Sequence, residues 1–257
     1  MDLTFQWIGG ATAIIALVDL KIAIDPVLCP KGTIQDYFWF KSKRIEKPIY
    51  KKEDFDTIDL WLLTHNHEDH LDKLGLKMIN NNAYVVSNQN TVEKLAQKEL
   101  GQHAVLKWGE KKKYQIKTYT IEVEAIPAIH GVNPVSAFFA GKVNGYLVTI
   151  TKDNESKTIY FTSDTVYKKR VINKLKNRKI DLLVPNMGAA KQGSWIMTLT
   201  LNAKMLQKMI AKLNPKIVIP VHYGTFEHYK EPVEKIREIA DERVRIVAVG
   251  SKTKIIL

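Results

Sequence analysis

Apolar residues along the chain recur mostly in short runs, and several of these runs alternate with polar positions. From Val18 to Asp25, apolar and polar side chains alternate at nearly every position, a period of two that is typical of a β-strand. Other short apolar runs predict strands at Ile58–Leu63, Ala83–Ser87, Thr120–Ile126, Tyr146–Ile150, Thr158–Phe161, Leu182–Val184, Ile217–Val221 and Arg245–Val249.

Three segments have helical spacing instead. Residues 91–100 and 233–240 each place apolar residues on one side of a helix, and Asn202 can cap a third helix that ends before Pro215. Strands outnumber helices, and no repeat or Gly/Pro/Ser-rich linker divides the chain. We therefore expect one α/β domain over residues 1–257, built from packed sheet and helix layers.

The composition narrows the class of protein. The 257 residues are 45% hydrophobic and 26% charged, which excludes a disordered chain. The single cysteine, Cys29, excludes an internal disulfide framework and suits a reducing compartment; we expect it to be a small buried residue. Asp2 stands where a signal peptide carries a basic residue, and no apolar run approaches the roughly 20 residues of a membrane helix. We expect a cytoplasmic protein.

The net charge of +12, from 39 Lys and Arg against 27 Asp and Glu, favours anionic partners such as phosphorylated substrates, anionic lipid or nucleic acid. The alternative is a lysine-rich solvated surface. Residues 26–57 lack periodicity but hold four aromatic residues at 37–40 and six Lys or Arg residues between 41 and 52. We predict that this segment forms part of an active-site rim that selects anionic substrates; the alternative is a packed surface excursion.

Three of the seven histidines, His65, His67 and His70, fall within six residues, directly after the apolar run Leu60–Leu63. Imidazole is the commonest neutral metal ligand in proteins. On a locally extended backbone, His65 and His67 project to the same side, and a turn can bring Asp69 and His70 to an adjacent position. The alternative is a chance cluster of solvated histidines at a loop tip.

Three further residues with ligand chemistry occupy the same kind of place. His130, Asp164 and His222 each lie at or just beyond the end of a predicted strand, where loops build sites on a rigid sheet. Each of them alone is more often structural. Together with the histidine cluster they predict a metal site.

The segment His65-Asn66-His67-Glu68-Asp69-His70 resembles the His-x-His-x-Asp-His signature of the metallo-β-lactamase superfamily. The later His130, Asp164 and His222 match the remaining ligand motifs in order, and Asp25 matches an early supporting Asp. The resemblance implies a four-layer αββα metallo-β-lactamase sandwich.

Carried over position by position, the resemblance implies two metal ions. The first would be held by His65, His67 and His130, the second by Asp69, His70 and His222, and Asp164 would bridge them. Two divalent ions would acidify a bridging water and supply hydroxide for hydrolysis, with Asp69 and Asp164 as the catalytic carboxylates that offset metal charge. An imidazole-rich site favours zinc, and manganese or iron also fit.

Within the superfamily, the segments Trp7–Thr12, Asp25–Val27 and His222–Pro232 resemble the branch of phospholipases D that hydrolyse N-acylphosphatidylethanolamine. The ascorbate-6-phosphate lactonase-like hydrolases share much of this pattern. Two departures concern the substrate and leave the metal motifs intact. Gly10 stands where the phospholipase branch usually has His, and residues 194–202 lack a His that the branch often carries.

We predict a hydrolase of a phosphodiester or another small or lipid-like anionic ester. The alternatives are a lactonase or carboxylic ester hydrolase and, less favoured, a nuclease that uses basic runs such as residues 168–179. Tyr223 and Thr225 are candidate substrate contacts, with local structural hydrogen bonding as the alternative; Lys191 and Trp195 are candidates in a Gly-containing loop. His228 is a candidate proton donor, with a surface position as the favoured alternative, and His103 also has the character of a surface residue.

Overall fold

A computed structural model describes residues 1–37, 40–133, 141–191 and 198–257 of the chain. Its largest sheet has seven strands in the order β15-β1-β2-β3-β6-β7-β8. The pairs β15–β1, β1–β2 and β2–β3 are antiparallel, and the pairs β3–β6, β6–β7 and β7–β8 are parallel. Their bounds are β1 Asp2–Gly9, β2 Thr12–Ala16, β3 Lys21–Ile24, β6 Leu60–Leu62, β7 Tyr84–Ser87, β8 Gln102–Val105 and β15 Lys252–Ile256.

The second sheet has six strands in the order β14-β13-β12-β11-β10-β9. Strands β9 to β12 form an antiparallel meander, and β12, β13 and β14 are parallel. A separate antiparallel hairpin consists of β4 Ile34–Asp36 and β5 Lys41–Lys43. The bounds in the second sheet are β9 Lys111–Ile116, β10 Tyr119–Ala128, β11 Val143–Lys152, β12 Glu155–Phe161, β13 Leu182–Val184 and β14 Ile217–Val218.

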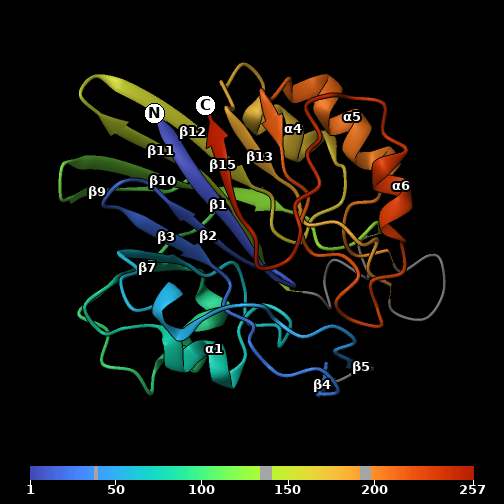
Figure 1. Cartoon of the computed structure of the whole chain (residues 1–257), viewed down its shortest axis with the longest axis horizontal. Helices are drawn as coiled ribbons and strands as arrows, with labels where there is room; N and C mark the ends of the chain where they lie inside the picture. Colours follow the sequence, from blue (N-terminus) through green and yellow to red (C-terminus); the bar gives the residue numbers. More distant parts are fainter. Residues whose placement is uncertain (38–39, 134–140, 192–197) are drawn as a thin grey trace.

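Helices lie outside the two sheets, with α1 on one side and α4, α5 and α6 on the other (Figure 1). The longest, α5, begins after Asn202, whose side chain accepts a hydrogen bond from the Met205 amide at 2.8 Å, and ends at Asn214 in the left-handed conformation. No helix in the described ranges is both long and apolar enough to cross a membrane. The helices are α1 Lys73–Met78, α2 Val92–Leu95, α4 Lys169–Leu175, α5 Ala203–Leu213 and α6 Val233–Arg237, with 3-10 turns η1 Lys52–Asp54 and η2 Gln89–Thr91.

Alternation along the strands sorts side chains between two faces of each sheet. In β6, Leu60 and Leu62 join the main core between the sheets, whereas Trp61 joins a second cluster on the outer face of the seven-stranded sheet. The main core also includes the buried face of α5, such as Leu206 and Met209. Helix, sheet, sheet and helix layers are therefore stacked, which confirms the predicted αββα sandwich.

The strand predicted from Val18 begins too early, and the strand predicted at 245–249 is wrong. Val18 is 94% exposed, because a turn closed by the Leu17 amide on the Leu20 carbonyl at 2.8 Å joins β2 to β3 before the alternating residues begin. Residues 245–249 form no strand, since the pairing next to β14 is a single bridge between Val218 and Val244. The helix predicted at 91–100 is confined to η2 and the short α2, because the residues after Ala96 form turns.

Candidate metal centre

All seven predicted ligand side chains gather in two groups. Within each group one donor atom per residue lies within 4.8 Å of the others, and every member is buried except the half-buried His67. The loops that carry them follow β6, β10, β12 and β14, so the site is assembled at one edge of the paired sheets. The first group is His65, His67 and His130, and the second is Asp69, His70, Asp164 and His222.

The histidines are oriented by hydrogen bonds through Nδ1. His130 donates to the Leu199 carbonyl at 2.9 Å and His222 to the Met187 carbonyl at 3.3 Å. Because a carbonyl only accepts, Nδ1 carries the proton in both rings. The Nε2 lone pair of each ring therefore faces the cluster, as a metal ligand requires.

Asp25 orients a further pair of rings. Its Oδ2 lies 2.7 Å from Nδ1 of His70 and accepts the Thr64 hydroxyl at 2.6 Å. The same hydroxyl oxygen lies 3.0 Å from Nδ1 of His65 and, having given its proton to Asp25, accepts from that ring. Asp25 thus supports both His65 and His70, in the supporting role that the resemblance implies for it.

Strained backbone accompanies these positions. Asp25, Ser163 and His222 have positive φ angles of 43°, 54° and 64°, a region that residues other than glycine seldom adopt. Ser163 directly precedes Asp164. Such conformations are costly and concentrate at functional sites, where the surrounding contacts hold them.

Asp164 lies between the two groups. Its Oδ1 is 3.2 Å from Nε2 of His70 and 3.5 Å from Nε2 of His222, and its Oδ2 is 3.6 Å from Nε2 of His130. The Asn186 amide donates to Oδ1 at 2.9 Å. One carboxylate thus faces histidines of both groups.

Asp69 contacts two side chains that are not among the predicted metal ligands. Nε2 of His228 and the Tyr229 hydroxyl lie 3.1 and 3.0 Å from its Oδ2, and the same hydroxyl lies 2.7 Å from Nε2 of His222. The expectation of a surface histidine at 228 is wrong, because aromatic rings and Ser42 bury it to 6% exposure. His103 is exposed, as expected.

The donor set fits a cationic metal. Oδ1 of Asp69 is buried with no hydrogen-bond partner among the described residues, a costly arrangement for a carboxylate unless a cation or water approaches it. Nε2 of His65 lies 3.0 Å from Nδ1 of His67, which turns two basic nitrogens toward each other. These residues form a His/Asp cluster able to bind metal.

Electrostatics differ between the groups. Burial lowers the pKa of His67 to about 3 and, with the neighbouring His70, lowers the pKa of His65 well below its usual value. Burial also acts on His70, but the carboxylates of Asp164 and Asp25 outweigh it and raise the pKa of His70 well above its usual value. Burial opposes ionisation of Asp164, yet His222 and His70 hold the pKa of its carboxyl well below its usual range. Burial thus dominates the shifts in the first group, whereas the neighbouring carboxylates dominate the shift at His70.

The candidate substrate contacts are placed very differently from one another. The Tyr223 ring packs on Trp7 with centroids 4.6 Å apart, within the main core. The Thr225 hydroxyl is buried without a partner among the described residues. Trp195 lies outside the described residues.

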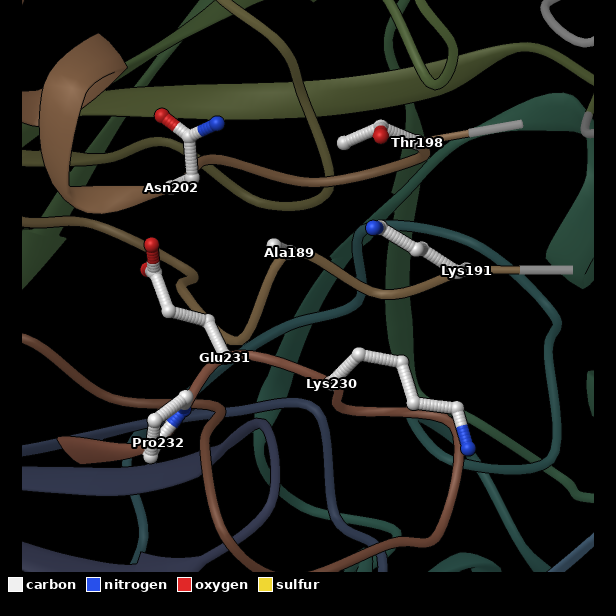
Figure 2. A pocket seen from close by; sticks show the side chains of 7 residues that line it. All are labelled: Ala189, Lys191, Thr198, Asn202, Lys230, Glu231 and Pro232. Carbon is white, nitrogen blue, oxygen red and sulfur yellow. The ribbon is translucent and has the colours of Figure 1, made fainter. Parts of the chain in front are cut away.

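Lys191 lines a cavity of about 270 Å³. Figure 2 shows its ammonium group directed toward Ala189 and the Lys230 side chain pointing away, with the Glu231 carboxylate facing Asn202. The cavity adjoins the metal-centre loops, since the Lys191 amide donates to the carbonyl of His228 at 3.0 Å.

The predicted rim segment does border the centre. The Tyr37 ring stacks on Phe40 at 4.6 Å and lies 6.1 Å from the His67 ring and 5.3 Å from the His228 ring. Lys41 and Lys43 are exposed. Arg44, one of the six basic residues of this segment, is fully buried and donates to the carbonyls of Val27 and Glu46.

Fold and site together define a metal-dependent hydrolase of the αββα class. The sequence profile of the β-lactamase superfamily domain matches residues 21–223. The chain belongs to this superfamily, in agreement with the resemblance noted in the sequence.

Relatives share much of this length. An N-acyl-phosphatidylethanolamine-hydrolyzing phospholipase D 1 from Caenorhabditis elegans is 25% identical over 264 residues, covering 92% of this chain and 69% of the relative. A UPF0173 metal-dependent hydrolase from Pyrococcus furiosus is 26% identical over 199 residues, covering 77% of this chain and 80% of the relative.

Solved structures share the fold. A possible metal-dependent hydrolase from Veillonella parvula superposes with a TM-score of 0.82 at 20% identity, covering 99% of both chains. An isothiocyanate hydrolase from Delia radicum gut bacteria superposes with a TM-score of 0.78 at 21% identity, covering 100% of this chain and 99% of the other.

Proposed function

We propose that the chain is a dinuclear metal hydrolase that cleaves a small or lipid-like anionic ester, with a phosphodiester as the leading substrate. The position of Asp164 carries the proposal, because its two oxygens face Nε2 atoms of His70 and His130 in different groups. His65, His67 and His130 would hold one ion, Asp69, His70 and His222 the other, and Asp164 would bridge them. Zinc is the leading ion, and manganese or iron also fit this donor set.

When bound, two divalent ions lower the pKa of water and supply hydroxide at neutral pH. The protein itself supplies negative charge that balances the metal ions and hydrogen bonds that orient their ligands. Asp69 and Asp164 offset positive charge with two carboxylates. Burial and the nearby Asp69 raise the pKa of the Tyr229 hydroxyl well above its usual value, so this group keeps its proton and remains a hydrogen-bond donor at Asp69 Oδ2.

The surroundings support an anionic substrate with an apolar portion. Tyr37 and Phe40 offer stacked rings beside His228, and Lys191 directs an ammonium group into the neighbouring cavity (Figure 2). The identity to a relative named for hydrolysis of N-acyl-phosphatidylethanolamine points the same way. Of the four candidate substrate contacts, we favour Lys191 as the residue that binds the anionic group of the substrate.

The test is a substrate panel on protein loaded with zinc, manganese or iron. The panel holds bis(p-nitrophenyl) phosphate, p-nitrophenyl acetate, a homoserine lactone and single-stranded DNA. Turnover of the phosphodiester above the ester and lactone is expected, with loss in Asp164→Asn and retention in the surface control Asp2→Asn. Preferred turnover of the lactone or ester would favour a carboxylic ester hydrolase, and preferred cleavage of DNA would favour a nuclease.

A further inference from the structure

The hairpin β4–β5 reaches the metal centre through one buried chain of polar contacts. Oγ of Ser42 lies 2.7 Å from Nδ1 of His228, and Nε2 of the same ring lies 3.1 Å from Oδ2 of Asp69. Exposure of Ser42, His228 and Asp69 is 2%, 6% and 2%. Three distant segments therefore meet away from solvent, where hydrogen bonds constrain orientation most strongly.

The hydrogen-bond directions follow from the chemistry of the two ends. The Asp69 carboxylate accepts only, so Nε2 of His228 carries a proton. In the neutral imidazole Nδ1 is then an acceptor, and the Ser42 hydroxyl is its donor. The Asp69 carboxylate thus selects the tautomer, and the Ser42 hydroxyl holds the opposite edge of the ring by donating to Nδ1.

Backbone contacts fix Ser42 in this place. The Glu227 amide donates to the Lys43 carbonyl at 3.0 Å. The backbones of Arg44 and Phe226 pair in an isolated antiparallel β-bridge. The imidazole of His228 is also flanked by Phe40 and Phe226, with ring centroids 5.6 and 5.8 Å away. The ring has little freedom to turn away from Asp69.

We propose that Ser42 and His228 are positioning residues that orient the Asp69 carboxylate for metal binding. The inference rests on the proposed function only in taking Asp69 as a ligand. His228 and Tyr229 both contact Oδ2, so the carboxylate plane is held, while Oδ1 accepts no hydrogen bond from the described residues. Hydrogen bonds of this kind to metal ligands typically contribute about 10–100-fold in metal affinity or activity.

Zinc affinity of the purified chain tests the proposal, measured by competition with a chromophoric chelator. His228→Phe keeps an aromatic ring but has no donor, and the weaker zinc equivalent should bind about 10–100-fold less tightly. His228→Gln keeps an N–H group near the Nε2 position and should retain most of the affinity. Ser42→Ala should lose about two- to tenfold, the effect of one neutral hydrogen bond.

A double-mutant cycle separates positioning from structure. Ser42→Ala should have no further effect on zinc affinity in the His228→Phe background, because it acts through the imidazole. His103→Phe is the matched control, since Ser87 contacts that histidine at the same 2.7 Å outside both metal groups. Circular dichroism and the melting temperature of each metal-free variant report folding.

Unchanged zinc affinity in His228→Phe, or an equal loss from Ser42→Ala in both backgrounds, would overturn the proposal. If His228→Phe does not fold, the pair His228→Gln and Ser42→Ala decides it, because loss of zinc affinity in Ser42→Ala alone is the expected result. The zinc affinity is measured without any substrate, so it does not depend on turnover. A wild-type chain that binds two zinc ions and cleaves nothing in the panel would count against the substrate class and not against this pair.

Discussion

Nδ1 of His70 lies 2.7 Å from Oδ2 of Asp25, with both side chains fully buried. Asp25 also accepts hydrogen bonds from the amide and the hydroxyl of Thr64. Since Asp25 directly follows β3 and Thr64 lies just beyond β6, this carboxylate joins the ends of two neighbouring parallel strands. It thereby fixes the start of the loop that carries the histidine cluster.

Asp25→Asn tests this relationship. Asn tolerates the left-handed φ of 43° at this position, so the change removes the charge without straining the backbone. We expect zinc affinity and turnover to fall about 10–100-fold while the fold survives. Asp25→Ala should also destabilise the protein. Full affinity in Asp25→Asn would show that His70 does not depend on the carboxylate charge.

Metal binding should depend on pH differently in the two groups. The carboxylates of Asp164 and Asp25 raise the pKa of His70, so a metal at the second group must displace a proton. Affinity there should rise with pH, up to about tenfold per unit for one displaced proton, until pH exceeds the pKa of His70. The first group should vary little between pH 5 and 8, since burial lowers the pKa of His67 to about 3. Calorimetric titrations at several pH values measure both slopes.

Asp164→Ala should reduce metal stoichiometry from two equivalents toward one. The substitution removes the carboxylate that faces both groups and leaves two cations without a shared anion between them. Elemental analysis after exhaustive zinc loading measures the ratio, and turnover should collapse together with it. Two equivalents with undiminished turnover in Asp164→Ala would assign the bridge to another group.

The sequence located the site chemistry because that chemistry is local. Three histidines follow one strand end, and Asp164 and His222 follow two others, where loops build sites on a rigid sheet. The same reasoning favoured a surface position for His228 and gave no sign that the hairpin β4–β5 contacts it. Ser42 and His228 are 186 residues apart, and no periodicity in either segment signals their contact.

Long-range packing also explains two residues whose exposure differs from what the local sequence pattern indicates. Arg44 lies among lysines in the sequence, a pattern typical of a solvated surface. In the fold, its Cζ atom lies over the Phe226 ring, 5.1 Å from the ring centroid. Val18 reads as part of an alternating strand but occupies a turn. In both cases a contact or turn decided by tertiary structure overrides the local pattern.

Gly75 should be essential for the fold beside the metal centre. A Cβ atom at this position in α1 would lie 1.7 Å from the carbonyl oxygen of Pro26, the residue after Asp25. Gly75→Ala should destabilise the protein by about 1–3 kcal/mol or more, lowering the melting temperature by at least several degrees. Gly101→Ala is the control, because its nearest contact is 3.4 Å. Equal melting temperatures for both variants would contradict the close approach.

The basic hairpin should contribute to selection of anionic substrates through Lys41 and Lys43. Both lysines are exposed on β5, the strand that also carries Ser42 at the metal centre. Arg44 is left unchanged in this test because it is buried, and its replacement would disturb the packing on Phe226. Lys41 faces Asp36 at 3.6 Å in an exposed pair, so the neighbouring carboxylate offsets part of the Lys41 charge.

Lys41→Gln/Lys43→Gln should raise KM for a phosphodiester at low ionic strength and much less at high ionic strength. Exposed charges are screened beyond about 10 Å at 0.1 M salt, so the effect should disappear as salt is added. KM for a neutral lactone or ester should stay nearly constant. Lys169→Gln/Lys174→Gln, which removes two exposed charges on α4, controls for net charge. Equal effects of the two double variants, or equal effects on charged and neutral substrates, would make the +12 charge a general surface property rather than part of substrate recognition.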